Sequence, residues 1–478
     1  MSRYDGLELG ELQTAVHDSL DSWWNPGSSE EQLLAYLLLV QRERAAIDGP
    51  LDPPSLRTAT NNVLEMLIDE LEVHEKRGAE VIRLRFLEDL TIRETAIRTY
   101  RSTDQVNRDQ KTAIEHLSRI LLAREMHARD SSLRQLQSDL PPSTYTQLFG
   151  FSEAAKLVTE KIIAEEAPWI VAITGLGGIG KTSLADASVR DALTSFRFEK
   201  AIWLQANSNP ISGEPLKPEE SYSQLIKALA ENLWPDEPQI SEEVIAAKAR
   251  DLLTEKPHLI IVDNLETSEA TQYIAEKAEG WARPTKIVIT SRARPTKPSL
   301  VYYHSLDELS FNDSAALLRH HAKIIGLDES SLASNDGLES IYRITGGNPL
   351  ALKLVVSLAT VLALPQVLQD IAENRKGPVE DMYRHIYWES WRSLTSDSQL
   401  LLQAMPLIAE SGALPEQMKA ISQLPDERFW PAVSELISRS LLEIKGTIHE
   451  RRYGIHRLTE TFLRTEIIGW SEEDQAEN

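Results

Sequence analysis

One eight-residue run constrains this chain more than any other feature. It is the segment Gly175-Leu176-Gly177-Gly178-Ile179-Gly180-Lys181-Thr182, which matches the pattern G-x-x-x-x-G-K-[ST] in full. An apolar run precedes the segment and a helical pattern follows it, and this is the strand, loop and helix context that the pattern requires. The run therefore predicts an α/β domain built on a parallel sheet.

The same loop predicts phosphate binding. Its glycines let backbone N–H groups close around phosphate oxygens, and the N-terminus of the next helix adds partial positive charge. Lys181 supplies charge to the β- and γ-phosphates, and the Thr182 hydroxyl is a ligand for Mg²⁺. We therefore expect a nucleotide and Mg²⁺ here, held by Gly175, Gly177, Gly178, Ile179, Gly180, Lys181, Thr182 and Ser183.

Two later strand ends carry further candidate catalytic residues. The apolar run 259–262 ends in Asp263, which is placed to hold Mg²⁺ directly or through water. Asn264 follows and cannot act as a general base, so Glu266 is the nearest candidate and hydrolysis is expected to be slow. The run 286–290 leads to Arg292, whose guanidinium could reach a γ-phosphate.

The order of apolar runs predicts the architecture. Short runs separated by longer helical patterns indicate a parallel sheet covered on both faces, and they are Trp169–Ile173, Ala201–Leu204, Leu259–Val262, Lys286–Thr290 and Leu300–Tyr303. From about residue 306 onward the pattern is helical, except for an expected hairpin at Leu442–Ile455 around the turn Lys445–Gly446. The fold class is multidomain, α/β plus α.

Composition excludes several classes of function. With 478 residues the chain is long enough for several domains, and its net charge of -23 makes it a poor non-specific nucleic-acid binder. It has 0 cysteines, which excludes disulfides and thiolate zinc sites and fits a reducing, cytoplasmic location. No signal peptide opens the chain, and polar residues interrupt the apolar stretch Ala351–Leu368, so no membrane association is expected.

Charge is distributed unevenly near the N-terminus. Residues 1–75 carry 4 basic and 15 acidic side chains, whereas residues 76–129 carry 12 basic and 8 acidic ones. The second segment is predicted to form three short helices, the second and third opened by the capping boxes Thr91/Glu94 and Ser102/Gln105. The short link between these two helices suits a helix-turn-helix.

The third predicted helix has two distinct faces. Its inward face is formed by Val106, Ala113, Ile114, Leu117 and Leu121. Arg108 and Lys111 project from the opposite face, where the groove of double-stranded DNA would lie. Units of three helices also serve as protein adaptors, and this second interpretation stays open.

Five motifs together give the chain a family resemblance. The motifs are GLGGIGKTS, LIIVDN, ITSR, GGNPLAL at Gly346–Leu352 and YGIHRLTETFLR at Tyr453–Arg464. In order and approximate spacing they resemble the NB-ARC group of STAND signalling ATPases. The resemblance covers about residues 149–470. It implies a nucleotide-binding domain, a helical domain and a winged-helix domain that close over ADP and open and oligomerise with ATP.

The resemblance also assigns site residues. It places Phe149, Gly150 and Pro349 beside the adenine, His456 at the β-phosphate of ADP, and Arg292 in the role of a sensor of the γ-phosphate. This chain departs from the family pattern at Asn264, where a second acid is frequent, and at Arg457, where an aspartate is frequent. These departures bear on the rate of hydrolysis and on the details of ADP binding.

The segment Val81–Ala96 resembles the helix-turn-helix of region 4 of bacterial sigma factors, which implies DNA binding and transcription regulation. The expected domains are an acidic helical region (1–75), a helix-turn-helix domain (76–129), a linker (130–147), an NB-ARC domain (148–305), a helical domain (306–376) and a winged-helix domain (377–478). The leading hypothesis is a switch with slow ATPase activity that acts on DNA. The alternatives are a defence or signalling scaffold that recruits a separate effector or sensor protein, and an ATPase that performs mechanical work.

Overall fold

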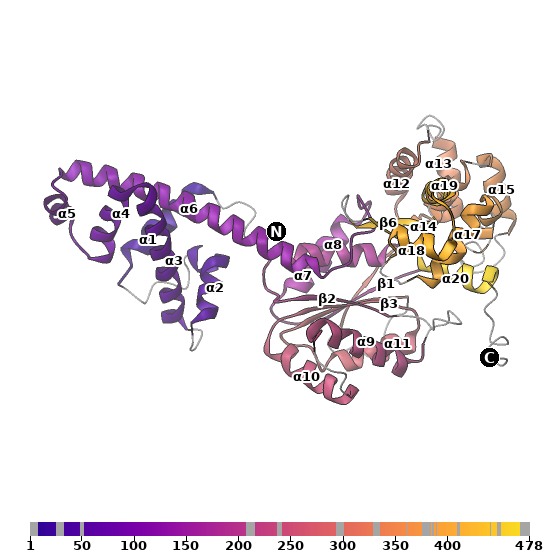
Figure 1. The fold of residues 1–478 in the computed structure, drawn as a ribbon, viewed down its shortest axis with the longest axis horizontal. Coiled ribbons are helices and arrows are strands. Elements are labelled where there is room, and N and C mark those ends of the chain that lie inside the picture. Colours follow the sequence, from indigo (N-terminus) through magenta and orange to yellow (C-terminus); the bar gives the residue numbers. More distant parts are fainter. Residues whose placement is uncertain are drawn as a thin grey trace. The chain divides into compact units, whose positions relative to one another are not determined.

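We describe a computed structural model of the chain (Figure 1). It describes residues 8–24, 33–47, 52–206, 216–236, 241–292, 301–327, 335–360, 362–374, 384, 387–388, 390–408, 412–439, 441–446 and 451–468. The chain divides into two compact units, residues 1–135 and 136–478, and each is described by itself. Among the described residues, none of the helices combines the length and the apolar character needed to span a membrane.

The N-terminal unit is entirely helical. Its elements are α1 (Leu9–Asp21), the 3₁₀ turn η2 (Leu33–Tyr36), α2 (Leu38–Ala46), α3 (Pro53–His74), α4 (Lys76–Ile82), the π-helical turn η3 (Arg83–Leu87), α5 (Ile92–Arg98) and α6 (Thr103–Ser138). A single core joins residues of the acidic segment to residues of the basic one. Val63 and Leu67 of α3 share this core with Leu117 and Leu121 of α6. The two segments therefore share one core within a single compact unit rather than forming two domains.

Helix α6 corrects two expectations. The third short helix and the linker at 130–147 were expected to be separate, but one helix of 36 residues continues to Ser138. No glycine or proline interrupts the sequence before Pro141, and Arg129 and Arg134 each pair with an acid one turn earlier. Such pairs at a spacing of four residues support a polar helix. The polar composition therefore marks a continuation of α6 to Ser138.

A buried glutamate fixes the position of α6 against α2. Glu125 is only 1% exposed, and its two carboxylate oxygens accept the backbone N–H groups of Leu38 and Leu39 at 2.8 and 3.1 Å. These N–H groups belong to the first turn of α2, which has no partner for them within the helix. Arg129 completes the cluster with an ion pair to Glu125 at 2.6 Å. Glu125 therefore replaces a capping side chain that the sequence before α2 does not provide.

The second unit is built on the predicted parallel sheet. Its strands are β1 (Ile170–Thr174), β2 (Ala201–Gln205), β3 (Leu259–Leu265), β4 (Lys286–Ser291) and β5 (Val301–Ser305), in the order β2-β3-β4-β1-β5. All of these strands pair in parallel, which confirms the predicted sheet.

Helices cover both faces of this sheet. Helices α7 (Ser152–Ile163) and α8 (Lys181–Leu193) lie on one face, and α9 (Pro218–Leu233), α10 (Glu242–Glu255) and α11 (Ser268–Ala278) lie on the other (Figure 1). Alternate strand residues such as Ile170, Ala172 and Ile260 point into the core shared with α9 to α11. The carboxyl ends of the strands share one edge of the sheet, where the candidate site lies.

The remaining described part of the chain is helical apart from one hairpin. Its elements are α12 (Phe311–Ile324), α13 (Asn335–Thr345), α14 (Pro349–Leu358), α15 (Leu364–Asn374), α17 (Ser396–Ala404), the 3₁₀ turn η5 (Met405–Leu407), α18 (Pro415–Ser422), α19 (Asp426–Ser438), β6 (Glu443–Gly446), β7 (Arg451–Gly454), α20 (Arg457–Phe462) and the π-helical turn η6 (Leu463–Ile468). The hairpin is confirmed, but the expected turn at Lys445–Gly446 is wrong. Both residues lie within β6, paired with Arg452 and Arg451.

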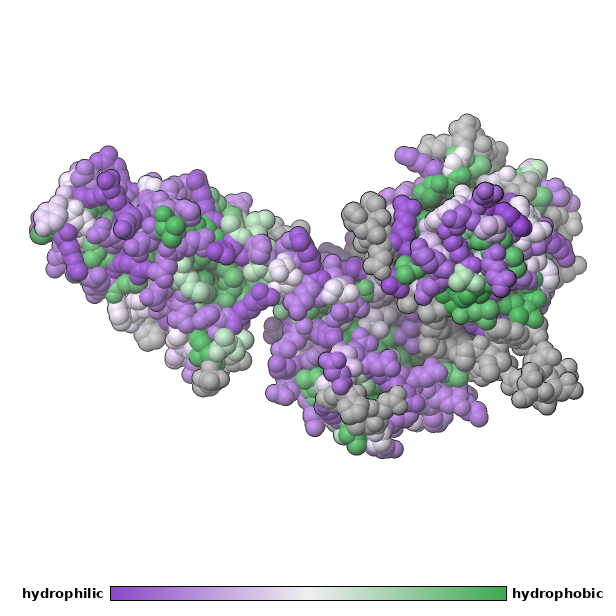
Figure 2. Space-filling view, viewed as in Figure 1, coloured by the Kyte–Doolittle hydropathy of each residue, from purple (hydrophilic) through white to green (hydrophobic). Residues whose placement is uncertain are grey.

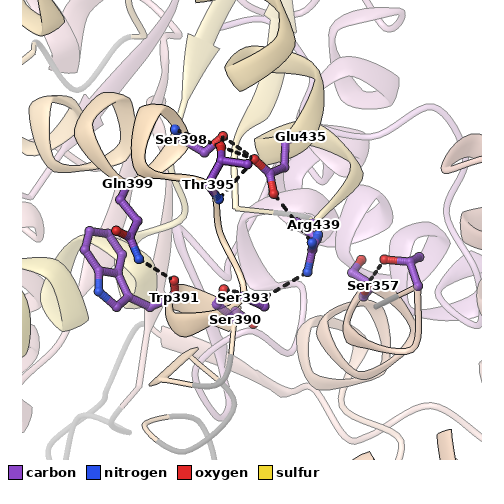
Figure 3. Close-up of polar contacts among 10 residues, drawn as sticks. Ser357, Ser390, Trp391, Ser393, Thr395, Ser398, Gln399, Glu435 and Arg439 are labelled. Atoms are coloured by element: carbon purple, nitrogen blue, oxygen red, sulfur yellow. Dashed lines mark hydrogen bonds and ion pairs between the residues drawn. The ribbon is translucent and has the colours of Figure 1, made fainter. Parts of the chain in front are cut away.

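A charged residue of α19 joins it to the start of α17 (Figure 3). Glu435 accepts hydrogen bonds from the hydroxyls of Thr395 and Ser398 and pairs with Arg439 at 3.5 Å. The Arg439 guanidinium donates in turn to Ser393 Oγ at 2.8 Å. Thr395 also caps α17, so one network both begins this helix and orients it against α19.

Candidate functional site

The phosphate loop adopts a conformation that only its glycines allow. Gly178 and Gly180 have φ angles of +71° and +103°, in the left-handed region that other residues rarely occupy. A Cβ atom on Gly178 would lie 2.7 Å from Cβ of Leu350, and one on Gly180 would lie 2.8 Å from the ring of Phe151. Both neighbours approach the loop too closely for any side chain. The loop is therefore fixed by its backbone conformation and by packing from outside.

Lys181 begins α8 and folds back over the loop. Its Nζ donates to the carbonyl oxygens of Gly175 and Leu176, both at 2.9 Å. Burial is the main reason why the pKa of Lys181 is lowered to about 8, and the nearby Arg292 lowers it further while Asp263 opposes the shift. The ammonium therefore lies at the strand ends, as the motif predicts.

Asp263 and Thr182 meet at the end of β3. The Thr182 hydroxyl donates to Asp263 Oδ1 at 2.9 Å, and the Thr290 hydroxyl donates to the same oxygen at 2.5 Å. A bulge between Val262 and Leu265 interrupts the pairing of β3 with β4, and Asn264 within it has a φ of +73°. Its N–H donates to Thr290 Oγ1 at 2.8 Å. The bulge thus turns the Asp263 carboxylate toward the phosphate loop.

These oxygen atoms fit Mg²⁺. The ion prefers hard oxygen ligands and is usually bound through one or two carboxylates together with phosphate oxygens and water. A buried carboxylate that touches the hydroxyl of the loop threonine provides two such ligands at one point. Asp263 and Thr182 are therefore the residues that would hold the ion.

Glu266 and Arg292 form an ion pair at the same edge of the sheet. Glu266 Oε1 lies 3.2 Å from Arg292 Nη2. Glu266, the expected general base, and Arg292, the expected sensor, thus form an ion pair with each other. The side chains are partly buried, with 14% and 33% of their surface exposed.

The N-terminus of α14 packs directly on the phosphate loop. Asn348 caps α14 by accepting the N–H groups of Leu350 and Ala351, and its amide group donates to the carbonyl oxygen of Gly177 at 3.1 Å. Pro349 occupies the first helical position, where its lack of an N–H group costs nothing. The predicted residue Pro349 is therefore placed beside the loop by its neighbour Asn348.

Phe149 and Gly150 lie just before α7 and against α12. The ring of Phe149 lies 5.4 Å from the ring of His320, and His320 Nε2 is 3.1 Å from the Thr146 hydroxyl. Gly150 has a φ of +72° and leaves no room for a side chain beside Leu309. Phe149 and Gly150 therefore connect the nucleotide-binding sheet to the helices that follow it.

His456 comes from the end of the hairpin and follows β7 directly. Burial is the main cause of its lowered pKa, the carboxylate of Glu443 opposes this, and Lys181, Lys353 and Arg292 lower the pKa further. Charges of the phosphate loop and of the end of β4 therefore act on His456, although these residues are far apart in the sequence.

The N-terminal residues expected to contact DNA are exposed. Arg108 and Lys111 lie on the outer face of α6, and the capping boxes Thr91/Glu94 and Ser102/Gln105 are both formed. The inward face of α6 is also buried as expected, from Val106 to Leu121. Many nearby arginines are already neutralised, because carboxylates of the same unit pair with Arg83, Arg98, Arg101, Arg119, Arg124 and Arg129.

A five-stranded parallel sheet, a glycine-rich phosphate loop before α8 and polar strand ends beside it define a P-loop nucleotide-binding domain. Residues 152–319 match the family described as the NB-ARC domain. Residues 152–319 of the chain therefore carry the match to the NB-ARC domain that the motifs predicted, and this part of the predicted resemblance is confirmed.

Several named proteins are similar to this chain. The disease resistance protein RPP13 of Arabidopsis thaliana is 25% identical over 340 residues, which cover 65% of this chain and 39% of that protein. A putative RPP13-like disease resistance protein 2 of the same plant is 23% identical and covers 41% of this chain and 23% of its own length. The chain thus spans a quarter to two fifths of these relatives.

Other matches extend beyond plants. An uncharacterised WD repeat-containing protein of Nostoc is 23% identical over 320 residues, which cover 62% of this chain and 25% of that protein. Among solved structures, a STAND protein with a tetratricopeptide repeat sensor from Pyrococcus horikoshii has a TM-score of 0.43 and 18% identity, covering 71% of this chain and 45% of its own.

Two residues of this site were missed from the sequence. Thr290 connects Asp263 to Asn264, and Asn348 connects the loop to α14. Asn348 had a readable signal, because an asparagine directly before proline is a frequent helix start. Thr290 had none, because its contact depends on the register and bulge between β3 and β4.

Proposed function

We propose that this chain is a signalling switch that is closed with ADP and that opens and forms homo-oligomers with ATP. The observation that carries the proposal is the contact of α14 with the phosphate loop, where the Asn348 amide donates to the carbonyl oxygen of Gly177 at 3.1 Å and the N–H of Leu350 donates to that of Gly178 at 3.3 Å. It connects the helical part that follows the sheet to the place where the nucleotide phosphates are expected. A nucleotide that interacts differently with these two parts shifts the balance between a closed and an open form.

The described elements support a winged-helix assignment for the C-terminal part of this switch. Helices α17, α18 and α19 are followed by the hairpin β6–β7, and Ala413, which lies between α17 and α18, pairs with Tyr453 of β7. Three helices with a small sheet of three segments in this order fit a winged helix. His456 follows the last of these segments directly.

The proposal includes adenine specificity and a resident Mg²⁺. Phe149, Gly150 and Pro349 are the residues proposed to contact the adenine, and Thr182 and Asp263 are those proposed to hold the ion. Mg²⁺ would neutralise phosphate charge when bound. The proposed hydrolysis is slow, since Asn264 lacks a carboxylate, and a cytoplasmic location belongs to the same proposal.

The experiment that tests the switch measures nucleotide content and mass together. Nucleotide is extracted from the purified full chain, and light scattering is then recorded with excess ADP and with excess ATP, each with Mg²⁺. We expect bound ADP on purification, a monomer with ADP and a larger species with ATP. A protein that carries no nucleotide and has the same mass in both conditions would contradict the proposal.

For the N-terminal unit we propose an output on double-stranded DNA through α5 and α6. The formed capping boxes and the exposed Arg108 and Lys111 support it. Binding should weaken linearly with the logarithm of salt concentration, with a slope of about -0.9 for each phosphate neutralised. Changing Arg108 and Lys111 together to glutamate should remove most of this binding in a gel-shift or anisotropy assay.

A second candidate, recruitment of a separate effector protein in defence or signalling, is favoured by the surface of α5 and its turn. Ile97 and Tyr100 are 76% and 97% exposed. The visible face of this unit is mostly hydrophilic with separate hydrophobic patches (Figure 2). The net charge is -11 for residues 1–75 and +4 for residues 76–129, so residues 1–129 together carry -7. A negative net charge disfavours binding to DNA phosphates. Absence of DNA binding at low salt in both nucleotide states would favour this candidate.

A further inference from the structure

Glu266 and Arg292 are paired because of how β3 and β4 end. Leu265 of β3 is in register with Ser291 of β4, and the N–H of Arg292 donates to the carbonyl oxygen of Leu265 at 3.0 Å. Glu266 and Arg292 are the next residue on each strand, so their side chains leave the sheet at the same point. The resulting contact of 3.2 Å follows from strand register.

This pair lies beside the lysine of the phosphate loop. Thr174 of β1 is in register with Ser291 of β4, and the N–H of Gly175 donates to the carbonyl oxygen of Ser291 at 3.3 Å, so Arg292 leaves the sheet next to the start of the phosphate loop. The charges of both residues also act on the Lys181 ammonium, because Arg292 lowers its pKa and Glu266 raises it. The Arg292 guanidinium is therefore one of the charged groups that would surround the phosphates of a bound nucleotide. It is held there by a carboxylate of its own chain.

We infer that Glu266 is a positioning residue that engages Arg292 in competition with the γ-phosphate and so lowers the preference of the site for ATP over ADP. The inference rests on the proposed nucleotide switch. The donors of the guanidinium that face the Glu266 carboxylate cannot at the same time face a γ-phosphate. ATP offers Arg292 a second partner at the end of its phosphate chain, and ADP offers none.

The competing role for Glu266 is that of a general base, which the sequence suggests. A base acts on the attacking water and changes the rate of hydrolysis. A residue that holds Arg292 instead changes the relative affinity for ATP and ADP, and it does so only while Arg292 is present. Affinity ratios and their dependence on Arg292 therefore separate the two roles.

The test is a double-mutant cycle on the full chain, with Mg²⁺ and with ATP and ADP titrated separately by calorimetry after removal of bound nucleotide. Glu266→Gln keeps the size of the side chain and removes its charge. We expect the ratio of ATP affinity to ADP affinity to rise about three- to tenfold, the range for a partly exposed charge-assisted contact. In an Arg292→Gln background the same change should leave this ratio within about twofold.

Two further variants complete the design. Glu269→Gln removes an exposed carboxylate three residues away and should leave the affinity ratio unchanged, which controls for general loss of negative charge. Glu266→Asp keeps the charge but shortens the reach to Arg292, so it should raise the ratio by less than Glu266→Gln does. It also serves if the glutamine variant fails to fold, as judged by its thermal melt.

Two outcomes would overturn the inference, and they are distinct from failure of the switch itself. Glu266→Gln could slow hydrolysis at an unchanged affinity ratio, and Glu266 would then be the base. The ratio could also rise equally with and without Arg292, and the effect would then be general electrostatics. A wild-type chain that binds neither nucleotide would instead contradict the proposed function.

Discussion

The two ends of the central sheet each hold a lysine, Lys286 fully buried and Lys181 partly buried, and the two lysines differ in what surrounds them. At the amino end Lys286 begins β4 with 0% of its surface exposed. Its Nζ donates to the carbonyl oxygens of Glu166 and Pro168 at 2.7 and 2.6 Å and lies 4.7 Å from the centre of the Trp169 ring. At the carboxyl end, Lys181 Nζ donates to two carbonyl oxygens of its own phosphate loop, those of Gly175 and Leu176.

The pKa of each lysine is lowered to about 8, with burial as the main cause in both cases. A nearby arginine lowers each pKa further, Arg197 for Lys286 and Arg292 for Lys181. The same shift therefore accompanies a structural lysine and a candidate ligand-binding one. A perturbed pKa alone therefore does not identify a functional site, and the two lysines are distinguished by the location of their carbonyl acceptors, which for Lys181 belong to the phosphate loop.

The largest expected effect that tests this comparison is that of Lys181→Met. Loss of the charge beside the phosphates should reduce ATP and ADP affinity by a hundredfold or more, on the order of 3 kcal/mol. The thermal melt should stay within a few degrees of wild type, because Lys181 adds little to the core. Nucleotide extracted from the purified variant should fall to background, and full occupancy would show that the loop lysine is not a ligand.

The matched variant Lys286→Met should show the opposite pattern. It leaves buried carbonyl oxygens without their donor, so we expect the free energy of unfolding to fall by about 2–3 kcal/mol. Nucleotide affinity of the folded fraction should be unchanged. Urea unfolding and calorimetry measure the two quantities, and a loss of affinity at unchanged stability would overturn the distinction between the two ends of the sheet.

The pH dependence of stability gives a third test. Because the pKa of Lys286 is lowered to about 8 in the folded chain from 10.5, the unfolded chain binds more protons between these values. Stability should therefore rise with pH from about 8 to 10, by up to about 1.4 kcal/mol per pH unit for this lysine. Urea unfolding at pH 7.5, 8.5 and 9.5 should show a smaller rise for Lys286→Met. An equal rise in both proteins would mean that Lys286 is not the titrating group.

The smallest effect is expected for His456→Ala. Because burial lowers its pKa, the imidazole is neutral near pH 7, and a neutral hydrogen bond to a phosphate oxygen contributes about 0.5–1.5 kcal/mol. ADP affinity should fall about two- to tenfold, and the fraction of oligomer with ATP should rise. The exposed His74→Ala is the control. An earlier melt at unchanged ADP affinity would assign His456 to packing alone.

Much of the fold follows from local sequence signals. The phosphate loop, the strands and the capping boxes at Thr91 and Ser102 depend on neighbouring residues, and the structure confirms them. The predicted length of α6 is wrong, because a polar composition is typical of linkers as well as of solvent-exposed helices. No glycine or proline breaks this helix, and it continues to Ser138. Pairs of opposite charge one turn apart, Glu125 with Arg129 and Asp130 with Arg134, support the polar end of this helix.

The candidate site was predicted residue by residue but not as a network. The structure brings Thr182 and Asp263 into contact beside Lys181, because the carboxyl ends of parallel strands meet at one edge of the sheet, and the ligand-binding roles of these residues stay predictions. The pairing of Glu266 with Arg292 was not foreseen, since it depends on the register of two strands. Register and bulges are set by packing of the whole sheet, which no local pattern contains.

The contact between α14 and the phosphate loop has a consequence for hydrogen exchange. Pro349 has no amide proton, so the first exchangeable amide of α14 belongs to Leu350, and its N–H contacts both Asn348 Oδ1 and the carbonyl oxygen of Gly178. Any rearrangement of the loop around phosphates changes an acceptor of this amide. The exchange rate at Leu350 therefore provides a label-free reporter of loop occupancy, located in a helix that follows the NB-ARC match in the sequence.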